Sequence, residues 1–158
     1  MEPSLEAIYT ELIIDHARHP VGKGLREPYT AEVHHINPTC GDELVLRVEL
    51  GPGEDPVLTD ISYDGTGCNI SMASVSILAE MATGQPLAAF GAQYQEFLRM
   101  MHGMGKVTPD EELLGDATAF AGVAQLPMRI KCALLGWMAV HDAVGQSLAA
   151  PVAEGEES

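Results

Sequence analysis

Three runs of alternating side chains constrain the fold of this chain more than any other feature of its sequence. They cover residues 29–35, 43–50 and 57–64, and apolar and polar residues largely alternate within each run. A period of two is typical of β-strands that bury one face of a sheet. Because the connections between the runs are short, neighbouring strands can pair in an antiparallel manner. The sequence therefore predicts a three-stranded antiparallel sheet.

Helical patterns flank these runs on both sides. Before them, apolar residues recur at helical spacing over residues 4–18, and Pro20 ends the pattern. After them, we expect long helices over residues 68–83, 86–101 and 127–144, and short ones at a capping box over residues 108–111 and over residues 117–124. Strands followed by helices, without βαβ alternation, predict an α+β domain. Its order is helix, three strands, helices, with the helices packed against the sheet.

The length of the chain, 158 residues, suits a single domain. All of the regular patterns lie within residues 1–145, which we assign to this domain. From residue 146 onward, small residues, a proline and acids show no periodicity. We expect residues 146–158 to form a disordered acidic tail.

The charge and the apolar pattern exclude several classes of partner. The formal net charge of −15 opposes binding to nucleic acid or to an anionic membrane surface. No apolar stretch reaches the roughly 18 residues that a membrane span needs, and no secretory signal pattern is present. The three cysteines include no CxxC pair, which favours a reducing compartment over a disulfide scaffold. We therefore expect a cytoplasmic protein that binds neither nucleic acid nor membrane.

The three thiols and one nearby carboxylate form the strongest candidate site. Cys40 and Asp42 lie in the turn between the first two predicted strands, and Cys68 and Cys132 lie near the starts of two predicted helices. Three thiolates and a carboxylate could complete the tetrahedral site that zinc prefers. The ligands are far apart along the chain, however, so their spacing alone is a weak signal. A metal or thiol site and three unrelated core thiols both remain open at this point.

Local features favour a site. Gly41 gives the turn conformational freedom, and Gly65 and Gly67 allow the backbone to come close beside Cys68. A helix N-terminus stabilises the Cys68 thiolate. Arg129, three residues before Cys132 on the same helical face, can offset negative charge there.

Other candidates are weaker. His34 and His35 point to opposite faces of a strand, so they cannot easily share a metal. The remaining histidines (His16, His19, His102 and His141) are scattered, and we expect most of them at the surface or at helix ends. The glycine-rich segment 65–67 precedes a helix but is not followed by GK[ST], which argues against nucleotide binding.

Three ordered motifs resemble the iron–sulfur cluster assembly proteins of the IscU and NifU N-terminal type. They are NPTCGD at 37–42, GTGCNISMAS at 65–74 and LPMRIKC at 126–132. The resemblance runs from about residue 5 to residue 144. It implies the IscU/NifU-like α+β fold and a metal site made of Cys40, Asp42, Cys68 and Cys132.

Two departures from the pattern of the scaffold proteins resemble the SufU branch of that family. Lys131 stands where the scaffold proteins have a histidine, and an extra stretch covers about residues 101–122. The resemblance to SufU implies zinc as the cofactor and sulfurtransferase activity. It also implies that Cys40 accepts persulfide sulfur from a cysteine desulfurase of the SufS type, that Arg129 stabilises the freed thiolate, and that the sulfur passes to downstream cluster assembly machinery.

Two alternatives remain. The same four residues could assemble a [2Fe–2S] cluster as a scaffold, since thiolate and carboxylate also ligate iron. The chain could instead be a non-catalytic regulator of the desulfurase, stabilised by zinc.

Overall fold

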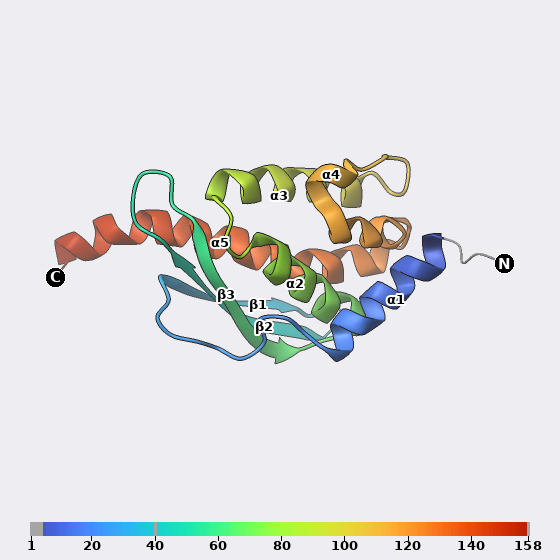
Figure 1. Ribbon diagram of the computed structural model, residues 1–158. Coiled ribbons are helices and arrows are strands. Elements are labelled where there is room, and N and C mark those ends of the chain that lie inside the picture. Colours follow the sequence, from blue (N-terminus) through green and yellow to red (C-terminus); the bar gives the residue numbers. More distant parts are fainter. Residues whose placement is uncertain (1–4, 40, 158) are drawn as a thin grey trace.

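A computed structural model describes the backbone of residues 5–39 and 41–157 and the side chains of residues 10–39 and 41–149. Within these residues the elements follow the predicted order of helix, three strands and helices (Figure 1). They are α1 (Leu5–Arg18), β1 (Ala31–Asn37), β2 (Asp42–Leu50), β3 (Leu58–Thr66), α2 (Asn69–Ala82), α3 (Leu87–His102), α4 (Glu111–Leu114), the 3₁₀ segments η1 (Gly115–Ala121) and η2 (Val123–Gln125), and α5 (Pro127–Glu157). The predicted α+β class is confirmed.

The three strands form one antiparallel sheet in the order β1-β2-β3, as predicted. Val33 on β1 pairs with Leu46 on β2, which also pairs with Tyr63 on β3. These three side chains are buried on the face that carries the helices. The same register places Asn37 directly opposite Asp42 at the end of the sheet.

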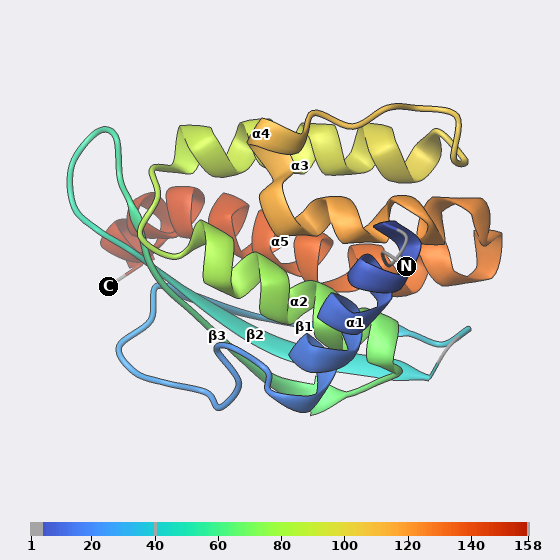
Figure 2. The ribbon, with the colours of Figure 1, turned by 45° about the vertical axis from the view of Figure 1, so that its right-hand side comes forward.

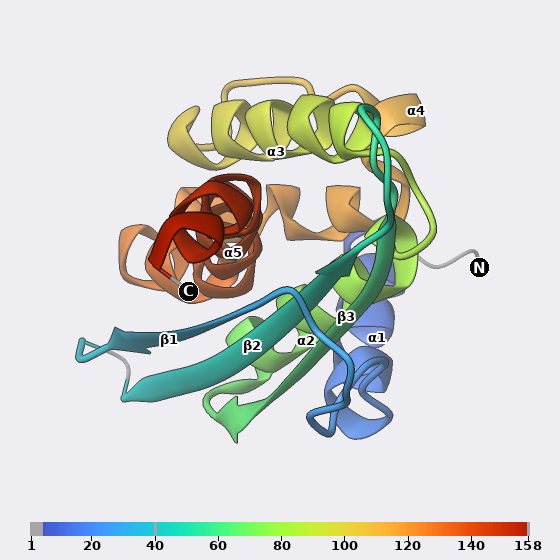
Figure 3. The same ribbon diagram turned by 90° about the vertical axis from the view of Figure 1, so that its left-hand side faces the viewer.

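The helices cover that face in layers. α5 packs on β1 and β2, and α2 packs beside α5 and against β3. Figure 3 shows α5 between the sheet and α3. Figure 2 shows α1 alongside α2, with which it makes extensive contact. No helix in the described part of the chain is long and apolar enough to cross a bilayer.

The extra stretch of about residues 101–122 is mostly exposed in its first half and packs into the core in its second half. It contains the end of α3, α4 and η1, and Leu114 and Phe120 are fully buried. The Phe120 ring meets the ring of Phe97 edge to face, with centroids 6.2 Å apart. The N-cap of α4 is Asp110, whose carboxylate accepts hydrogen bonds from the N–H groups of Glu112 and Leu113. Thr108, the first residue of the predicted capping box, is therefore not the cap.

The last helix continues beyond the predicted domain boundary. α5 extends through residue 146, where the sequence predicted the start of a disordered tail. Ser147 is 2% exposed, and its hydroxyl donates to the Ala143 carbonyl at 2.8 Å. The predicted start of the tail is therefore wrong, because small residues such as Ala143 and Ser147 pack closely without giving a strong apolar pattern.

Candidate metal centre

The fold brings three of the four predicted ligands together at one end of the sheet. Asp42 begins β2, Cys68 immediately precedes α2, and Cys132 lies in the second turn of α5. One carboxylate oxygen of Asp42 and the two sulfur atoms all lie within 4.8 Å of one another. The ligand atoms of a tetrahedral zinc ion lie roughly 3.3–3.8 Å apart, so this limit is wider by about 1 Å or more. The fourth predicted ligand, Cys40, lies outside the described residues.

Asp42 is the most informative member of the group. Its side chain is fully buried, and Oδ1 accepts the Cys68 N–H at 3.0 Å. Its other oxygen, Oδ2, is buried and has no hydrogen-bond partner among the described residues. A buried carboxylate oxygen without a partner is costly, and coordination of a cation removes that cost. The donor set and this unpartnered oxygen therefore fit a metal ion.

Cys68 lies at the N-terminal end of α2 and is partly exposed. The partial positive charge at this end of a helix stabilises a nearby anion such as a thiolate. The Cys68 sulfur is 3.7 Å from the Ser71 hydroxyl, which also lies 3.0 Å from the Cys68 carbonyl and donates to it. Cys68 is thus held in place by the first turn of the helix and by Asp42.

Cys132 is fully buried, and its sulfur faces the end of β1. The side-chain amide of Asn37 points at this sulfur, with Nδ2 4.0 Å from Sγ. Asn37 lies within the first motif, residues 37–42, but no role was expected for it. Its position depends on the pairing of Asn37 with Asp42 across the sheet, which no local sequence pattern shows.

The glycines around the site have the backbone freedom and the close contacts that the sequence predicted. Gly41 has a φ of +73°, a left-handed conformation that glycine adopts readily. A Cβ atom on Gly67 would lie 2.7 Å from Asp42 Oδ1 and 2.5 Å from the Ser71 hydroxyl. A Cβ atom on Gly65 would collide with the Glu43 carbonyl. The close backbone approach predicted beside Cys68 is therefore confirmed.

Arg129 lies at the surface, one turn before Cys132 on α5. Its backbone N–H donates to the Leu126 carbonyl at 2.8 Å. Among the described residues, its guanidinium forms no ion pair or hydrogen bond with Asp42 or either sulfur. Its predicted role toward Cys40 stays a prediction.

His34 and His35 diverge, as predicted. His34 Nε2 lies 2.6 Å from Glu43 on the exposed face, and His35 Nε2 lies 2.9 Å from Asp142 on α5. The hydrogen bond from His35 lowers the pKa of Asp142 below its ordinary value. Neither ring belongs to the metal centre.

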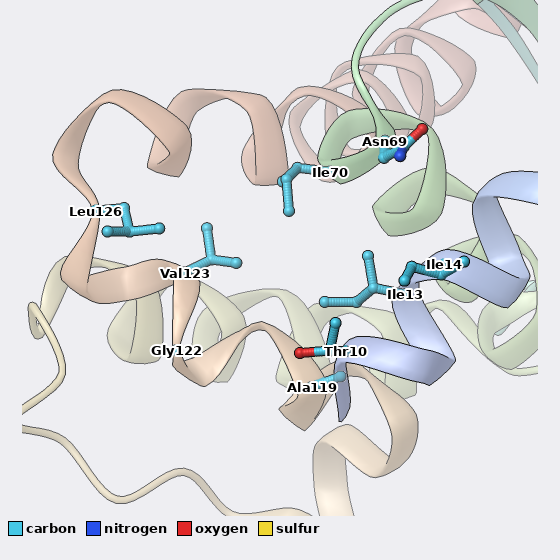
Figure 4. Close-up of a pocket in the computed structure, with 9 residues that line it drawn as sticks. All are labelled: Thr10, Ile13, Ile14, Asn69, Ile70, Ala119, Gly122, Val123 and Leu126. Carbon is cyan, nitrogen blue, oxygen red and sulfur yellow. The ribbon is translucent and has the colours of Figure 1, made fainter. Parts of the chain in front are cut away.

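A separate cavity of about 440 Å³ begins immediately after Cys68 along the chain (Figure 4). Its walls come from α1, the start of α2 and the two 3₁₀ segments, and they are mainly apolar. The side chains of Ile13, Ile70 and Val123 point into it, and Thr10 and Asn69 contribute the few polar atoms. None of the lining residues is titratable, so the metal-binding groups lie outside this cavity.

The fold and the site together define a class of protein. A carboxylate and two cysteine sulfur atoms from three separate elements converge at one end of a small antiparallel sheet covered by helices, an arrangement that could hold a metal ion. The family model for NifU-like N-terminal domains matches residues 8–146. The chain therefore belongs to this family, and its predicted place among the SufU-type members is confirmed.

Relatives with known names support this family assignment. The chain is 35% identical over 144 residues to the zinc-dependent sulfurtransferase SufU of Bacillus subtilis, covering 90% of this chain and 93% of that protein. It is 34% identical to the iron–sulfur cluster assembly scaffold protein IscU of Streptococcus pyogenes, covering 90% and 86% respectively. A solved structure assigned to iron–sulfur cluster assembly for the SUF system of Fervidobacterium islandicum aligns with a TM-score of 0.72 at 31% identity, covering 89% and 98%.

Proposed function

We propose that this protein is a zinc-dependent sulfur relay. It takes persulfide sulfur from a cysteine desulfurase of the SufS type onto Cys40 and passes it to the machinery that assembles iron–sulfur clusters. The observation that carries the proposal is the buried Asp42 Oδ2, which has no hydrogen-bond partner among the described residues. It belongs to a carboxylate that has an oxygen within 4.8 Å of the sulfurs of Cys68 and Cys132. The name of the Bacillus subtilis relative supports zinc as the ion.

The ligands would be Asp42, Cys68, Cys132 and Cys40. When bound, zinc keeps coordinated thiols deprotonated and holds them in place. The roles of the ligands differ because of their surroundings. Asp42 and Cys132 are fully buried on regular elements, which suits permanent ligands, whereas Cys40 follows the exposed Thr39 and precedes the exposed Gly41.

The transfer itself is a thiol exchange at Cys40. The Cys40 thiolate attacks the outer sulfur of the desulfurase persulfide, and a new sulfur–sulfur bond forms on Cys40. The sulfur–sulfur bond of the donor breaks, and the desulfurase cysteine leaves as a thiolate. No external oxidant or reductant is consumed. The exposed Arg129 guanidinium would stabilise the anionic sulfur on Cys40, and a reducing compartment such as the cytoplasm would keep the thiols available.

A second function is favoured by the relative named as a scaffold. Two sulfurs, an additional thiol and a carboxylate could hold a [2Fe–2S] cluster as cargo. Metal analysis of anaerobically purified protein separates the two functions. Stoichiometric zinc without a visible chromophore supports the relay, whereas labile iron and sulfide support the scaffold.

The role of Cys40 is tested by Cys40→Ser. We expect this variant to retain substantial zinc, because three ligands remain, but to accept no sulfur from the desulfurase. Mass spectrometry of the chain after incubation with desulfurase and cysteine measures the added sulfur, and metal analysis measures zinc. Thr39→Ser is the matched control, since it changes the neighbouring residue and keeps the thiol.

Sulfur transfer to Cys40→Ser at the wild-type level would refute the acceptor role. Desulfurase turnover with Cys40→Ala separates the relay from a regulator that acts only by binding. A regulator would still stimulate turnover with this variant, whereas a relay would not.

A further inference from the structure

A second cluster of metal-ligating side chains lies away from the centre described above. It joins His16 near the end of α1, Glu80 on α2 and Asp116 at the start of η1. One nitrogen of His16 and one oxygen of each carboxylate all lie within 4.8 Å of one another. Figure 2 shows α1 and α2 side by side, so the three groups meet where separate parts of the fold come together.

His16 is the unusual member of this cluster, because it is a buried histidine in the last turn of α1. Only 6% of the residue is exposed. Its Nδ1 lies 2.8 Å from the hydroxyl of Ser76, which also accepts the backbone N–H of Val21 at 2.8 Å. Its Nε2 faces the other way and is 3.5 Å from Glu80 Oε1.

This arrangement is the one that metal-bound histidines adopt. A ligating histidine usually donates its second ring N–H to a fixed acceptor, which sets the tautomer and the ring orientation. Here Ser76 can be that acceptor, which leaves the Nε2 lone pair on the side of Glu80. Nε2 and Glu80 are too far apart for a short hydrogen bond, and a cation can occupy the space between them.

We propose that His16, Glu80 and Asp116 form a second site for a divalent first-row transition ion such as Mn²⁺, with water completing its coordination. One imidazole and two carboxylates suit such ions, whereas thiolates select softer ones. Ligands on opposite sides of an ion with bonds of about 2.1 Å lie about 4.2 Å apart. Glu80 and Asp116 are exposed, so small rotations of their side chains can close the site.

A cation there would link α1, α2 and η1 through one shared ion. It would tie α1 and η1 to α2, so binding should raise the stability of the fold in proportion to the free ion concentration. The site acts independently of sulfur transfer and does not depend on the proposed function.

In the test, the chain as purified, with whatever metal it carries, is titrated with Mn²⁺, which competes poorly for a thiolate site. Electron paramagnetic resonance measures unbound Mn²⁺. We expect one bound Mn²⁺ per chain in the wild type and at least a tenfold weaker affinity in the double variant Glu80→Gln, Asp116→Asn. The control is Glu54→Gln, Asp55→Asn, which removes two exposed carboxylates from the loop between β2 and β3 and should bind as the wild type does.

Far-ultraviolet circular dichroism shows whether the double variant is folded. Equal Mn²⁺ affinity in the two double variants would overturn the proposal, because the ion would then be attracted only by the net charge of −15.

Discussion

Asp42→Asn is expected to weaken zinc binding by more than about a hundredfold while leaving the fold intact. The amide keeps the oxygen that accepts the Cys68 N–H, so the local hydrogen bond is preserved. The substitution replaces Oδ2, which has no hydrogen-bond partner among the described residues, with a neutral amide nitrogen that is a poor zinc ligand. Changes to groups that merely support a ligand already cost about 10- to 100-fold in metal affinity, and loss of a ligand should cost more. Competition with a chromogenic chelator measures the affinity.

Glu43→Gln is the matched control for this variant. Glu43 is the next residue on β2 and points to the exposed face, where it pairs with His34. The Glu43→Gln substitution removes the same charge one residue away from Asp42. An exposed pair such as Glu43 with His34 contributes about 1 kcal/mol or less to stability. If both variants held zinc with wild-type affinity, Asp42 would not be a ligand.

Trp137→Ala is expected to lower the free energy of unfolding by about 3–5 kcal/mol. Trp137 is fully buried on α5, and its ring stacks on Phe97 with centroids 4.1 Å apart and planes 4° apart. The Phe90 ring also stacks on the Trp137 ring, with centroids 6.3 Å apart. Truncation of Trp137 to alanine would therefore open a cavity between α5 and α3. Because a small domain has only about 5–15 kcal/mol of stability, this is a large loss.

The matched variant Trp137→Phe should cost much less. It keeps an aromatic ring against Phe97 and removes an indole N–H that is buried and has no partner among the described residues. Urea unfolding at a fixed zinc concentration, followed by far-ultraviolet circular dichroism, measures both variants. A loss below about 1 kcal/mol for Trp137→Ala would contradict this account of the core.

The sheet and the order of the elements could be predicted because their signals are local. Alternation along one strand shows which of its residues face the core, as for Val33 and Leu46, without knowledge of any other strand. Gly65 and Gly67 likewise marked the close approach beside Cys68. The convergence of Asp42, Cys68 and Cys132 was suggested by family motifs, since their separation along the chain carried little information.

Features that depend on tertiary packing could not be predicted in this way. Asn37 reaches Cys132 only because the sheet register places it opposite Asp42. His16 is buried because α1 packs on α2, and a single histidine in a helical pattern does not show which neighbour will cover it. The continuation of α5 past residue 146 was missed because its inner face is made of small residues.

The central claim is that sulfur and oxygen atoms from separate elements bind one zinc ion. Zinc K-edge X-ray absorption of the purified protein tests it most directly. The account predicts zinc–sulfur scattering at about 2.3 Å together with a shorter oxygen shell, and fewer sulfurs around zinc in Cys68→Ser. A zinc ion surrounded only by nitrogen and oxygen, or a sulfur count that does not change in Cys68→Ser, would contradict it.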